Sequence, residues 1–473
     1  MRILIIGDSP KVTGGVSNYT RPLFLEQKKS DIEVKYLYSA SRLKADYRFF
    51  TKTKITKDPL WEEGVYKIVN SDNLDKNYDR LELDSNSQKN DQVYEKFIQD
   101  YSPDVIHINE IIGFSTNIIN IAKSKNIKVI VTVHEYWWLC PKRVMVDFNR
   151  KICPGPNDLK KCTHCISLVS KGYDSSKRKK SYLIRNQFPR LYKLLSSIKQ
   201  KLKKKDIQKL ESLNFGKEKV PSAVNQVLKE QLSKRLNNNI QLLNRCDKII
   251  GVSKDVKDHL VKYGVNSDII IVQHIGSAIA EKTIIHQKKV QKNKIIIGFI
   301  GGVSYYKGVH QLVEAFISMP DEYKRKSKLE IFGNYNVNYK DSIGKNILEG
   351  ETYPEKVKFY GRYVSTDIPE ITNKIDIAVL PSLCADTAPQ TIFESFSSQL
   401  PLIVPNVGGF PDFITHKENG LIYEASNVKS LREALMYVID HPDKIEEMRA
   451  NIPEMKTISS NTKELIKLYN EVI

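Results

Sequence analysis

The stretch "GFIGGVSYYKGVHQLVEAF" (residues 298–316) joins the end of a short apolar run to a glycine-rich turn, a lysine and an amphipathic helical pattern. Short apolar runs between helical patterns are typical of strands buried in a parallel sheet. The same alternation occurs in two series along the chain. The first series comprises 2–7, 32–39, 104–109, 128–135, 248–253 and 268–274, and the second comprises 294–302, 329–333, 357–361, 377–382 and 402–409. We therefore predict an α/β fold with two doubly wound, Rossmann-like domains, whose ligands bind beyond the carboxyl ends of the strands.

The length of the chain also predicts two domains. It has 473 residues, of which 41% are hydrophobic, and this is more than one ordinary core accommodates. We expect an N-terminal domain over 1–275, with a basic helical insertion at about 166–245. The C-terminal domain is expected over 276–455, beginning with a polar linker, and a helix over 456–473 is expected to pack back on the first domain.

The charge balance favours anionic partners. Lys and Arg number 74 against 55 Asp and Glu, which gives a formal charge of +19. No apolar run approaches the ~18 residues of a membrane span, and the start "MRILIIGDSP" reads as a strand rather than a signal peptide. Six cysteines in so long a chain do not indicate a disulfide scaffold, so we expect a cytoplasmic location.

A second stretch, "DTAPQTIFES" (386–395), predicts a loop that turns into a helix. Its Thr387 and Gln390 have the spacing of a capping box, and Pro389 falls in the expected first turn. The preceding apolar run ends at residue 382, so the helix start lies at the carboxyl edge of the predicted sheet. The first amides of a helix lack intrahelical partners and form an anion site.

Two carboxylates flank this helix start. Asp386 precedes the helix and Glu394 lies about two turns inside it. A diphosphate on the amides near Gln390 and Thr391 would leave a sugar on one side and a ribose on the other, and carboxylates can accept hydrogen bonds from both. The alternative is a capped helix with solvated acids.

Taken together, these motifs resemble those of the retaining glycosyltransferases of family four (glycosyl transferases group 1), which have the GT-B fold of two Rossmann-like domains facing a cleft. A further glycine pair in "PNVGGFPDFITHKENGLIY" (405–423) belongs to the set. The resemblance covers most of the chain and weakens at about 40–100 and across 166–245. In that family two glutamates are separated by seven residues, and Asp386 and Glu394 occupy the matching positions here.

The resemblance implies a role for each matching residue of the second domain. Glu394 would bind the donor ribose, Asp386 the sugar hydroxyls, Lys307 the diphosphate, the amides of Gln390 and Thr391 a phosphate oxygen, and Arg362 the base or the phosphates. Arg362 is equally well explained as a surface arginine. Two positions depart from the family pattern: Asp386 stands for the usual glutamate, and Gly302 stands where an arginine usually helps to hold the leaving diphosphate.

In the first domain the resemblance points to a glycine loop and a histidine. Gly14 and Gly15 lie in "VTGGVSNYT" (12–20), whose family counterpart approaches the donor with its backbone; a plain turn is the alternative. His134 ends the run 128–135, and the matching histidine of the family lies beside the donor sugar. A neutral imidazole there could exchange a hydrogen bond with a sugar hydroxyl, whereas the alternative is a structural histidine.

Four cysteines lie within 26 residues. Cys140, Cys153, Cys162 and Cys165 are separated by 12, 8 and 2 residues. A C-x-x-C pair with two further thiols can form a tetrahedral structural zinc site, and the alternative is reduced, partly buried thiols.

The insertion carries twelve Lys or Arg and no acid over 177–205, with apolar residues at alternating four- and three-residue spacing. This predicts a helix that begins near Pro189. The helix either packs on its own domain or lies on an anionic membrane near a lipid-linked acceptor. Nucleic acid is not an expected partner, because the segment has no recognised module or stacking aromatics.

These patterns predict a retaining, hexosyltransferase-like, metal-independent enzyme. It would move a sugar from a nucleotide-diphosphate sugar to a hydroxyl of a glycan or lipid-linked acceptor, in cell-surface polysaccharide or glycolipid synthesis. No cofactor is required for the catalysis, and the expected location is the cytoplasm, peripheral on the inner face of the membrane. A catalytically silent binding subunit of the same fold is the alternative, and a nucleotide-sugar epimerase comes third.

Overall fold

The computed structural model describes residues 1–11, 14–39, 47–49, 51–74, 76–170, 174–193, 196, 222–281, 289–335, 343 and 354–473. The chain divides into two compact units. The first unit comprises Met1–Gly251, Lys257–Ile271 and Glu464–Ile473, and the second comprises Val252–Val256 and Val272–Lys463. The predicted linker begins close to the point where the chain enters the second unit.

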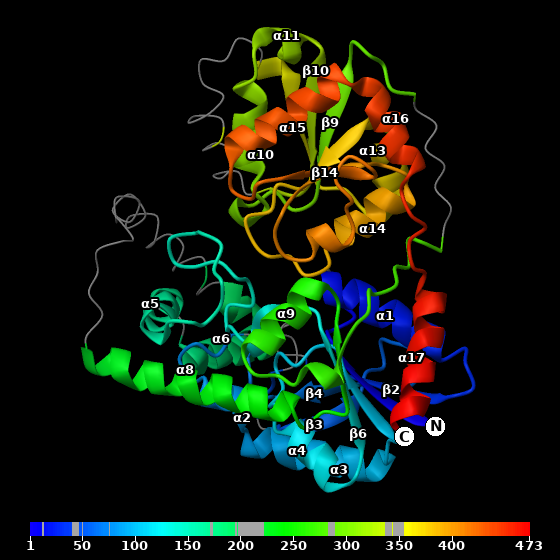
Figure 1. Cartoon of the computed structure of the whole chain (residues 1–473). Coiled ribbons are helices and arrows are strands. Elements are labelled where there is room, and N and C mark those ends of the chain that lie inside the picture. Colours follow the sequence, from blue (N-terminus) through cyan, green and yellow to red (C-terminus); the bar gives the residue numbers. More distant parts are fainter. Residues whose placement is uncertain are drawn as a thin grey trace. The chain divides into compact units, whose positions relative to one another are not determined.

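The first unit is built on an eight-stranded sheet with the order β3-β4-β2-β1-β5-β6-β7-β8 (Figure 1). Its strands are β1 (Arg2–Gly7), β2 (Glu33–Ser39), β3 (Lys54–Lys57), β4 (Val65–Val69), β5 (Val105–Ile108), β6 (Lys128–Val133), β7 (Lys248–Gly251) and β8 (Ile270–Val272). The pairings from β4 through β7 are parallel, and β3 is antiparallel to β4. All six runs of the first predicted series are strands, whereas β3 and β4 were not predicted.

Helices connect these strands. They are α1 (Gly15–Gln27), α2 (Glu82–Ser85), α3 (Gln88–Tyr101), α4 (Ile118–Ser124), α5 (Leu159–Ser170), α6 (Ser175–Gln187), α8 (Ser222–Leu243) and α9 (Lys254–Lys262). The last helix, α17 (Ile458–Val472), returns to this unit, where the Tyr469 hydroxyl lies 3.0 Å from Gln27 Nε2 and 2.7 Å from His107 Nδ1. The C-terminal helix therefore packs on the first unit.

The second unit has a six-stranded parallel sheet with the order β11-β10-β9-β12-β13-β14. The strands are β9 (Ile295–Ile300), β10 (Ser327–Phe332), β11 (Val357–Gly361), β12 (Ile377–Val379), β13 (Leu402–Pro405) and β14 (Gly420–Tyr423). Its helices are α10 (Val309–Ile317), α11 (Asp321–Arg325), α13 (Ile368–Lys374), α14 (Gln390–Ser397), α15 (Val428–Asp440) and α16 (Pro442–Ala450). The five runs of the second predicted series are strands, and β14 is an additional one.

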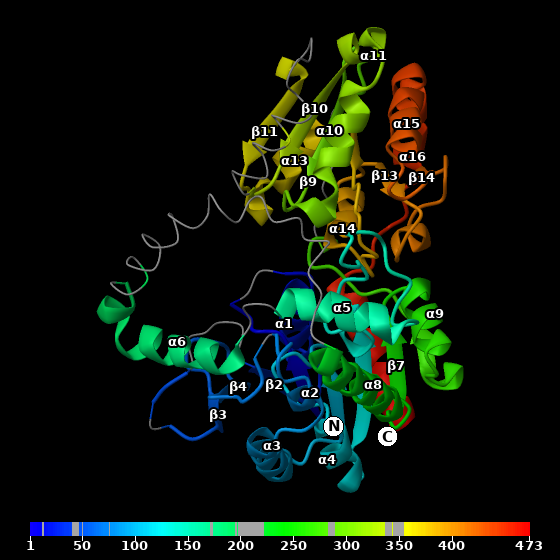
Figure 2. The same ribbon diagram turned by 90° about the vertical axis from the view of Figure 1, so that its left-hand side faces the viewer.

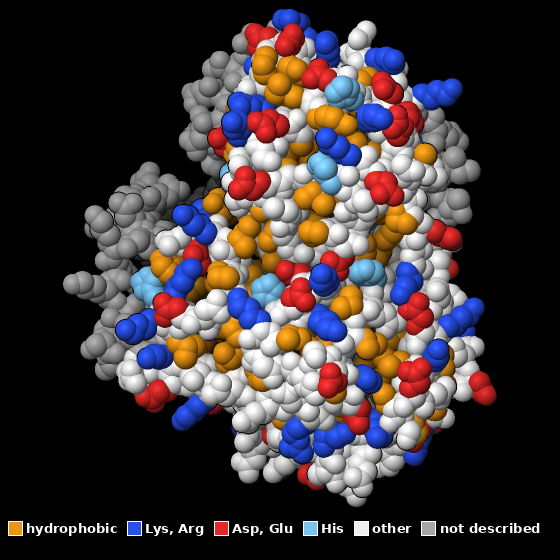
Figure 3. All heavy atoms as spheres, viewed as in Figure 1, with side chains coloured by type: hydrophobic (Ala, Val, Ile, Leu, Met, Phe, Trp, Pro, Cys, Tyr) orange, Lys and Arg blue, Asp and Glu red, His pale blue; other side chains and the backbone are white. Residues whose placement is uncertain are grey.

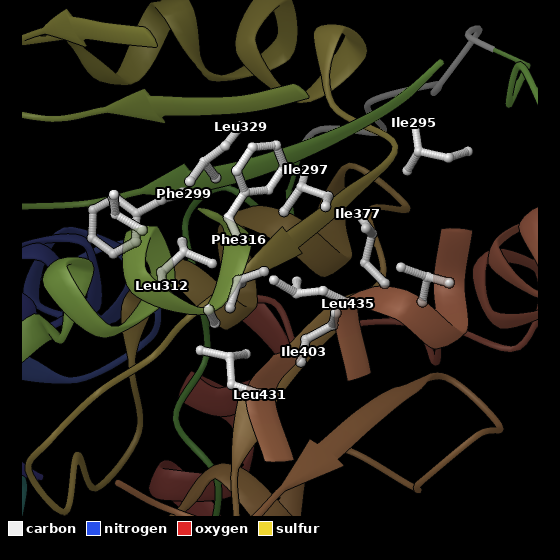
Figure 4. Close-up of a cluster of buried hydrophobic side chains, with 14 of the residues drawn as sticks. Ile295, Ile297, Phe299, Leu312, Phe316, Leu329, Ile377, Ile403, Leu431 and Leu435 are labelled. Atoms are coloured by element: carbon white, nitrogen blue, oxygen red, sulfur yellow. The ribbon is translucent and has the colours of Figure 1, made fainter. Parts of the chain in front are cut away.

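Alternate residues of these strands face two separate cores, as expected for a sheet covered by helices on both faces. Ile297 and Phe299 of β9 pack with Leu312 of α10 and with α15 in one core, which Figure 4 shows. Ile300 and the residues of α13 and α14 form the core on the other face. The predicted fold class, α/β with two doubly wound units, is confirmed.

The insertion contains α5, α6 and α8. Residues 189–193 are helical, so a helix begins at the predicted Pro189, but most of the basic run beyond it lies outside the described residues. Tyr182 of α6 packs on Tyr47 and Leu74 of its own unit. Among the described residues, no helix is both long and apolar enough to cross a membrane.

Candidate functional site

The centre of the second sheet is a topological switch point. From β9 the chain runs outward through β10 and β11 and then returns to β12, which pairs with the other side of β9. In doubly wound sheets ligands bind at such a point, beyond the carboxyl ends of the two strands. The loops after β9 and β12 carry Lys307 and Asp386, so the topology brings these two predicted residues together.

A glycine sets the position of Lys307. Gly308 follows the lysine with φ 67°, in the left-handed region that favours glycine. A Cβ at this position would lie 1.8 Å from the carbonyl oxygen of Pro381, which belongs to the loop after β12. The two loops are also joined by the Leu383 amide, which donates to the Tyr306 carbonyl at 2.8 Å. Only glycine therefore permits this close approach of the lysine loop to the Asp386 loop.

Lys307 and Asp386 form an ion pair. Lys307 Nζ lies 2.8 Å from Asp386 Oδ2, and the Ser382 hydroxyl donates to the same oxygen at 2.9 Å. Cys384 Sγ lies 3.7 Å from Asp386 Oδ1. Burial, the largest single effect, works against the charged lysine, but the charges of Asp386 and Cys384 and the hydrogen bond to Asp386 together raise the pKa of Lys307 above its ordinary value. The lysine is therefore a permanent cation at neutral pH.

The ion pair lines a hollow of about 380 Å³ at the switch point. Gly301, Gly302, Ser382 and Thr391 are among its other lining residues. A Cβ built on Gly302 would have no atom within 4 Å, so the position has room for a side chain. Gly302, where the resemblance implied an arginine, thus leaves open space in the hollow that Lys307 also lines.

Helix α14 begins at this hollow, but not with the predicted cap. Its first residue is Gln390, its N-cap is Pro389, and no side chain caps it. The capping-box prediction is therefore wrong: proline offers no side-chain acceptor, and Thr387 lies too early in the chain to be the N-cap. Since Thr391 lines the hollow, the first turn of α14 presents its free amides there.

Glu394 lies on the second turn of α14. Burial raises the pKa of its carboxyl group to about 7. Burial and the nearby charge of Glu394 also raise the pKa of Tyr363, which places this tyrosine close to the carboxylate. Ser382 and Tyr363 were not predicted, since a lone serine or tyrosine at a strand end gives no sequence signal. Arg362 is exposed and does not line the hollow.

In the first unit, Gly14 and Gly15 lie at the exposed start of α1, just after β1. Gly14 has an extended backbone (φ 176°) that any residue can adopt. A Cβ there would meet only Ser17 Oγ, at 3.9 Å. The local fold therefore does not require glycine at position 14, which is consistent with close approach of a ligand to this backbone.

His134 follows β6 at the carboxyl edge of the first sheet. Its Nε2 lies 3.1 Å from Asn109 Oδ1, and because an amide oxygen only accepts, Nε2 carries the proton. The ring also packs against Tyr19, with centroids 5.1 Å apart. Burial lowers the pKa of His134 to about 3, so the imidazole is neutral at physiological pH.

The four clustered cysteines line one pocket of the first unit, and Lys142 Nζ lies 3.3 Å from Cys165 Sγ. Each is a free thiol. Within the described part of the chain, no group of three or more His, Cys, Asp or Glu is arranged to hold a metal ion. The thiols are thus gathered in one place without metal-site geometry, and zinc stays a prediction.

Comparison with known protein sequences finds similarity to glycosyltransferases. Residues 281–455 match the family model described as "Glycosyl transferases group 1". An uncharacterized glycosyltransferase of Methanocaldococcus jannaschii is 21% identical over 236 residues, which cover 49% of this chain and 59% of that protein. The chain thus spans little more than half the length of the curated relative.

Solved structures show the same fold. HepE of Anabaena in complex with UDP superposes with a TM-score of 0.59 at 13% identity, covering 99% of this chain and 100% of that one. The lipopolysaccharide outer core galactosyltransferase WaaB gives a TM-score of 0.59 at 12% identity, with both chains covered completely. At such low identity these likenesses establish the fold alone, and that fold is GT-B, as predicted.

Proposed function

Since residues 281–455 match the family model of the glycosyl transferases group 1, we propose that the chain is a glycosyltransferase that moves a sugar from a nucleotide-diphosphate sugar to a hydroxyl group of an acceptor. The observation that carries this proposal is the hollow at the switch point of the second sheet. There a permanent cation, Lys307, lies beside Asp386 and the uncapped start of α14. HepE of Anabaena, which has the same fold, is known in complex with UDP-glucose, so a uridine diphosphate sugar is the first donor to test.

We assign each candidate site residue of the second unit a role in donor binding. Lys307 and the amides of Gln390 and Thr391 hold the diphosphate, because they place positive charge where the leaving group becomes negative. Glu394 accepts hydrogen bonds from the ribose, and Asp386 accepts them from the sugar. Tyr363, close to Glu394, is a further candidate for contact with the nucleoside.

The proposed reaction retains the configuration of the anomeric carbon. The bond from this carbon to the β-phosphate oxygen breaks, and the acceptor oxygen forms a bond on the same face. The acceptor's hydroxyl proton passes to the leaving phosphate oxygen, so no enzymatic base is needed. Lys307 and the helix amides stabilise the departing diphosphate, and on this ground we propose that catalysis requires no metal.

We assign the neutral imidazole of His134 to a hydrogen bond with the donor sugar, and the backbone of Gly14 and Gly15 to approach of the donor. His134 donates to Asn109 through Nε2, and a neutral imidazole can exchange a hydrogen bond with a sugar hydroxyl. A His134→Ala variant should therefore lose transfer activity far more than it loses affinity for the nucleotide alone, which calorimetry and a transfer assay would separate.

For the acceptor we propose a glycan or a lipid-linked glycan of cell-surface polysaccharide or glycolipid synthesis, with the protein peripheral on the inner membrane face. Phe188 and Leu191, which lie within the basic run 177–205, are 54% and 47% exposed. Exposed apolar side chains next to cations suit an anionic membrane surface. Sedimentation with phosphatidylglycerol vesicles at low salt tests this: protein that stays in the supernatant would refute membrane attachment.

The silent-subunit alternative rests on two positions: Gly302, which removes one of the two cations expected beside the diphosphate, and Asp386, which stands for the usual glutamate. A screen of nucleotide sugars separates an enzyme from a silent binding subunit. The screen measures binding by thermal stabilisation and turnover by hydrolysis or transfer. Turnover of any donor supports the enzyme. Tight nucleotide binding without turnover of any donor–acceptor pair supports the binding subunit.

A further inference from the structure

Another polar pocket lies in the first unit, and none of its lining residues is among those assigned to the donor. It is a hollow of about 1030 Å³ that opens to solvent. The segment before β3, the residues after β4, and helices α3 and α6 form its walls. Figure 2 shows α6 beside the end of the sheet that carries β3 and β4.

This pocket is strongly cationic. Its charged lining residues are Arg48, Lys52, Lys89, Lys179 and one acid, Asp72. Lys179 Nζ lies 2.7 Å from Asp72 Oδ1, and Lys89 Nζ lies 4.0 Å from Asp72 Oδ2, so the single carboxylate is shared by two lysines. Within the described residues, Arg48 and Lys52 have no ion-pair partner. The described lining of this pocket therefore has three more cations than acids.

The segment that carries the free cations is fixed to the sheet. Asn70, which is 8% exposed and directly follows β4, accepts from the Arg48 amide at 2.8 Å. Its own amide group donates to the carbonyls of Arg48 at 2.9 Å and Thr51 at 2.5 Å. Arg48 and Thr51 are thus each hydrogen-bonded to Asn70. The cations are held at a defined place, unlike the interspersed charges over the face shown in Figure 3.

The location suits a ligand. β4 is parallel to β2 and β1, so Asn70 and Asp72 lie at the carboxyl edge, where doubly wound sheets bind ligands. β4 and β6 are four strand spacings apart in the sheet order, or roughly 19 Å at ~4.8 Å per spacing. A small ligand in this pocket therefore cannot also place its reacting hydroxyl at His134.

We propose that this pocket binds a phosphate or diphosphate group of an extended acceptor, remote from the hydroxyl that is glycosylated. Several cations in one pocket match a group with more than one negative charge, and the Arg48 guanidinium can hold two phosphate oxygens at once. This role rests on the proposed transferase function, since it assigns the pocket to the acceptor.

The test uses inorganic pyrophosphate as the probe and the full chain with saturating UDP, which occupies the donor site. Calorimetry should show pyrophosphate binding to the wild type and at least tenfold weaker binding to the double variant Arg48→Gln, Lys52→Gln. The matched control is Lys54→Gln, Lys57→Gln, which removes the same charge from exposed positions on β3 outside the pocket. The control should bind pyrophosphate as the wild type does.

UDP affinity separates this proposal from the proposed function. It should be the same in the wild type and both double variants, and a chain that fails to bind UDP would contradict the donor site without deciding the pocket. Wild-type protein that ignores pyrophosphate, or equal weakening by both double variants, would overturn the pocket assignment.

Vesicles of phosphatidylglycerol distinguish the source of the phosphate. If the pocket variant loses pyrophosphate binding but still sediments with vesicles, the pocket binds a phosphate on the glycan side. If it loses both while the control keeps both, the pocket binds a lipid head group.

Discussion

Lys307 Nζ and Asp386 Oδ2 lie 2.8 Å apart, although 79 residues separate them in the chain. They come from the loops after β9 and β12, the two central strands of the second sheet. In the proposed donor complex the lysine would have to serve both this carboxylate and a diphosphate. The ion pair thus links the sugar side of the site to its phosphate side.

This link predicts opposite effects on binding and on transfer when Asp386 is changed to alanine. UDP affinity should stay within about threefold of wild type or improve, because Lys307 loses a competing anion. Transfer should fall by about 100-fold, since sugar hydroxyls lose their acceptor (~2.7 kcal/mol). Calorimetry and a transfer assay measure the two effects. A large loss of UDP affinity would show that Asp386 acts on the nucleotide instead.

Gly302 offers a gain-of-function test. A Cβ there meets no atom within 4 Å, so Gly302→Arg should fit and place a second cation beside the diphosphate. We expect UDP to bind about tenfold more tightly, which corresponds to about 1.4 kcal/mol. Gly302→Ala is the control and should leave the affinity unchanged. If the arginine variant binds UDP no better than the alanine variant, the diphosphate is not beside residue 302.

The carboxyl group of Glu394 predicts a pH-dependent affinity. Its pKa is raised by burial to about 7, and only the ionised form accepts hydrogen bonds at both oxygens. UDP affinity should therefore fall by up to about tenfold from pH 8 to pH 6, as the carboxylate becomes protonated. Glu394→Gln controls for titration of UDP itself. An identical pH profile in wild type and variant would remove Glu394 from the site.

The carboxyl group of Glu394 also makes the stability of the folded protein depend on pH. Because the folded state raises the pKa of Glu394 from 4.5 to about 7, it binds the proton more tightly than the unfolded chain does. This group's contribution to stability is therefore greatest below pH 4.5 and is lost as the pH rises to 7. The thermal midpoint of Glu394→Gln minus that of wild type should increase between pH 5 and pH 8, as followed by calorimetry. A constant difference would mean that Glu394 is not buried.

The sequence spacing of Cys140, Cys153, Cys162 and Cys165, and not their geometry in the pocket, predicts one zinc ion per chain in protein purified without chelators. Elemental analysis measures this directly. Replacing Cys162 and Cys165 by serine should remove the zinc and lower the thermal midpoint. Metal-free wild-type protein with four titratable thiols would establish the alternative, a pocket of reduced cysteines.

The strands of both sheets were readable from sequence where they are buried and apolar, as in "RILIIG" and "KIIIGFI". β3 ("KITK") and β4 ("VYKIV") were not, because they lie toward the edge of the first sheet and carry lysines on faces that water reaches. β14 ("GLIY") was missed for a different reason: it is mostly buried, but its four residues make too short an apolar run to be recognised.

Within the site, motif spacing predicted that Lys307 and Asp386 belong together, but not that they form an ion pair. The contact depends on Gly308, which brings two distant loops together at Pro381. Ser382 was missed because its hydroxyl acts through Asp386. Such contacts depend on tertiary geometry, for which the chain carries no local pattern.

The most direct test of the central claim is calorimetric titration of UDP in the presence of EDTA, with wild type, Lys307→Ala and Glu394→Ala. The account predicts that wild type binds one UDP per chain without added metal. Each variant should bind it at least tenfold more weakly, because a phosphate loses its cation or a ribose loses its acceptor. Undiminished affinity in both variants would place the nucleotide elsewhere and contradict the account.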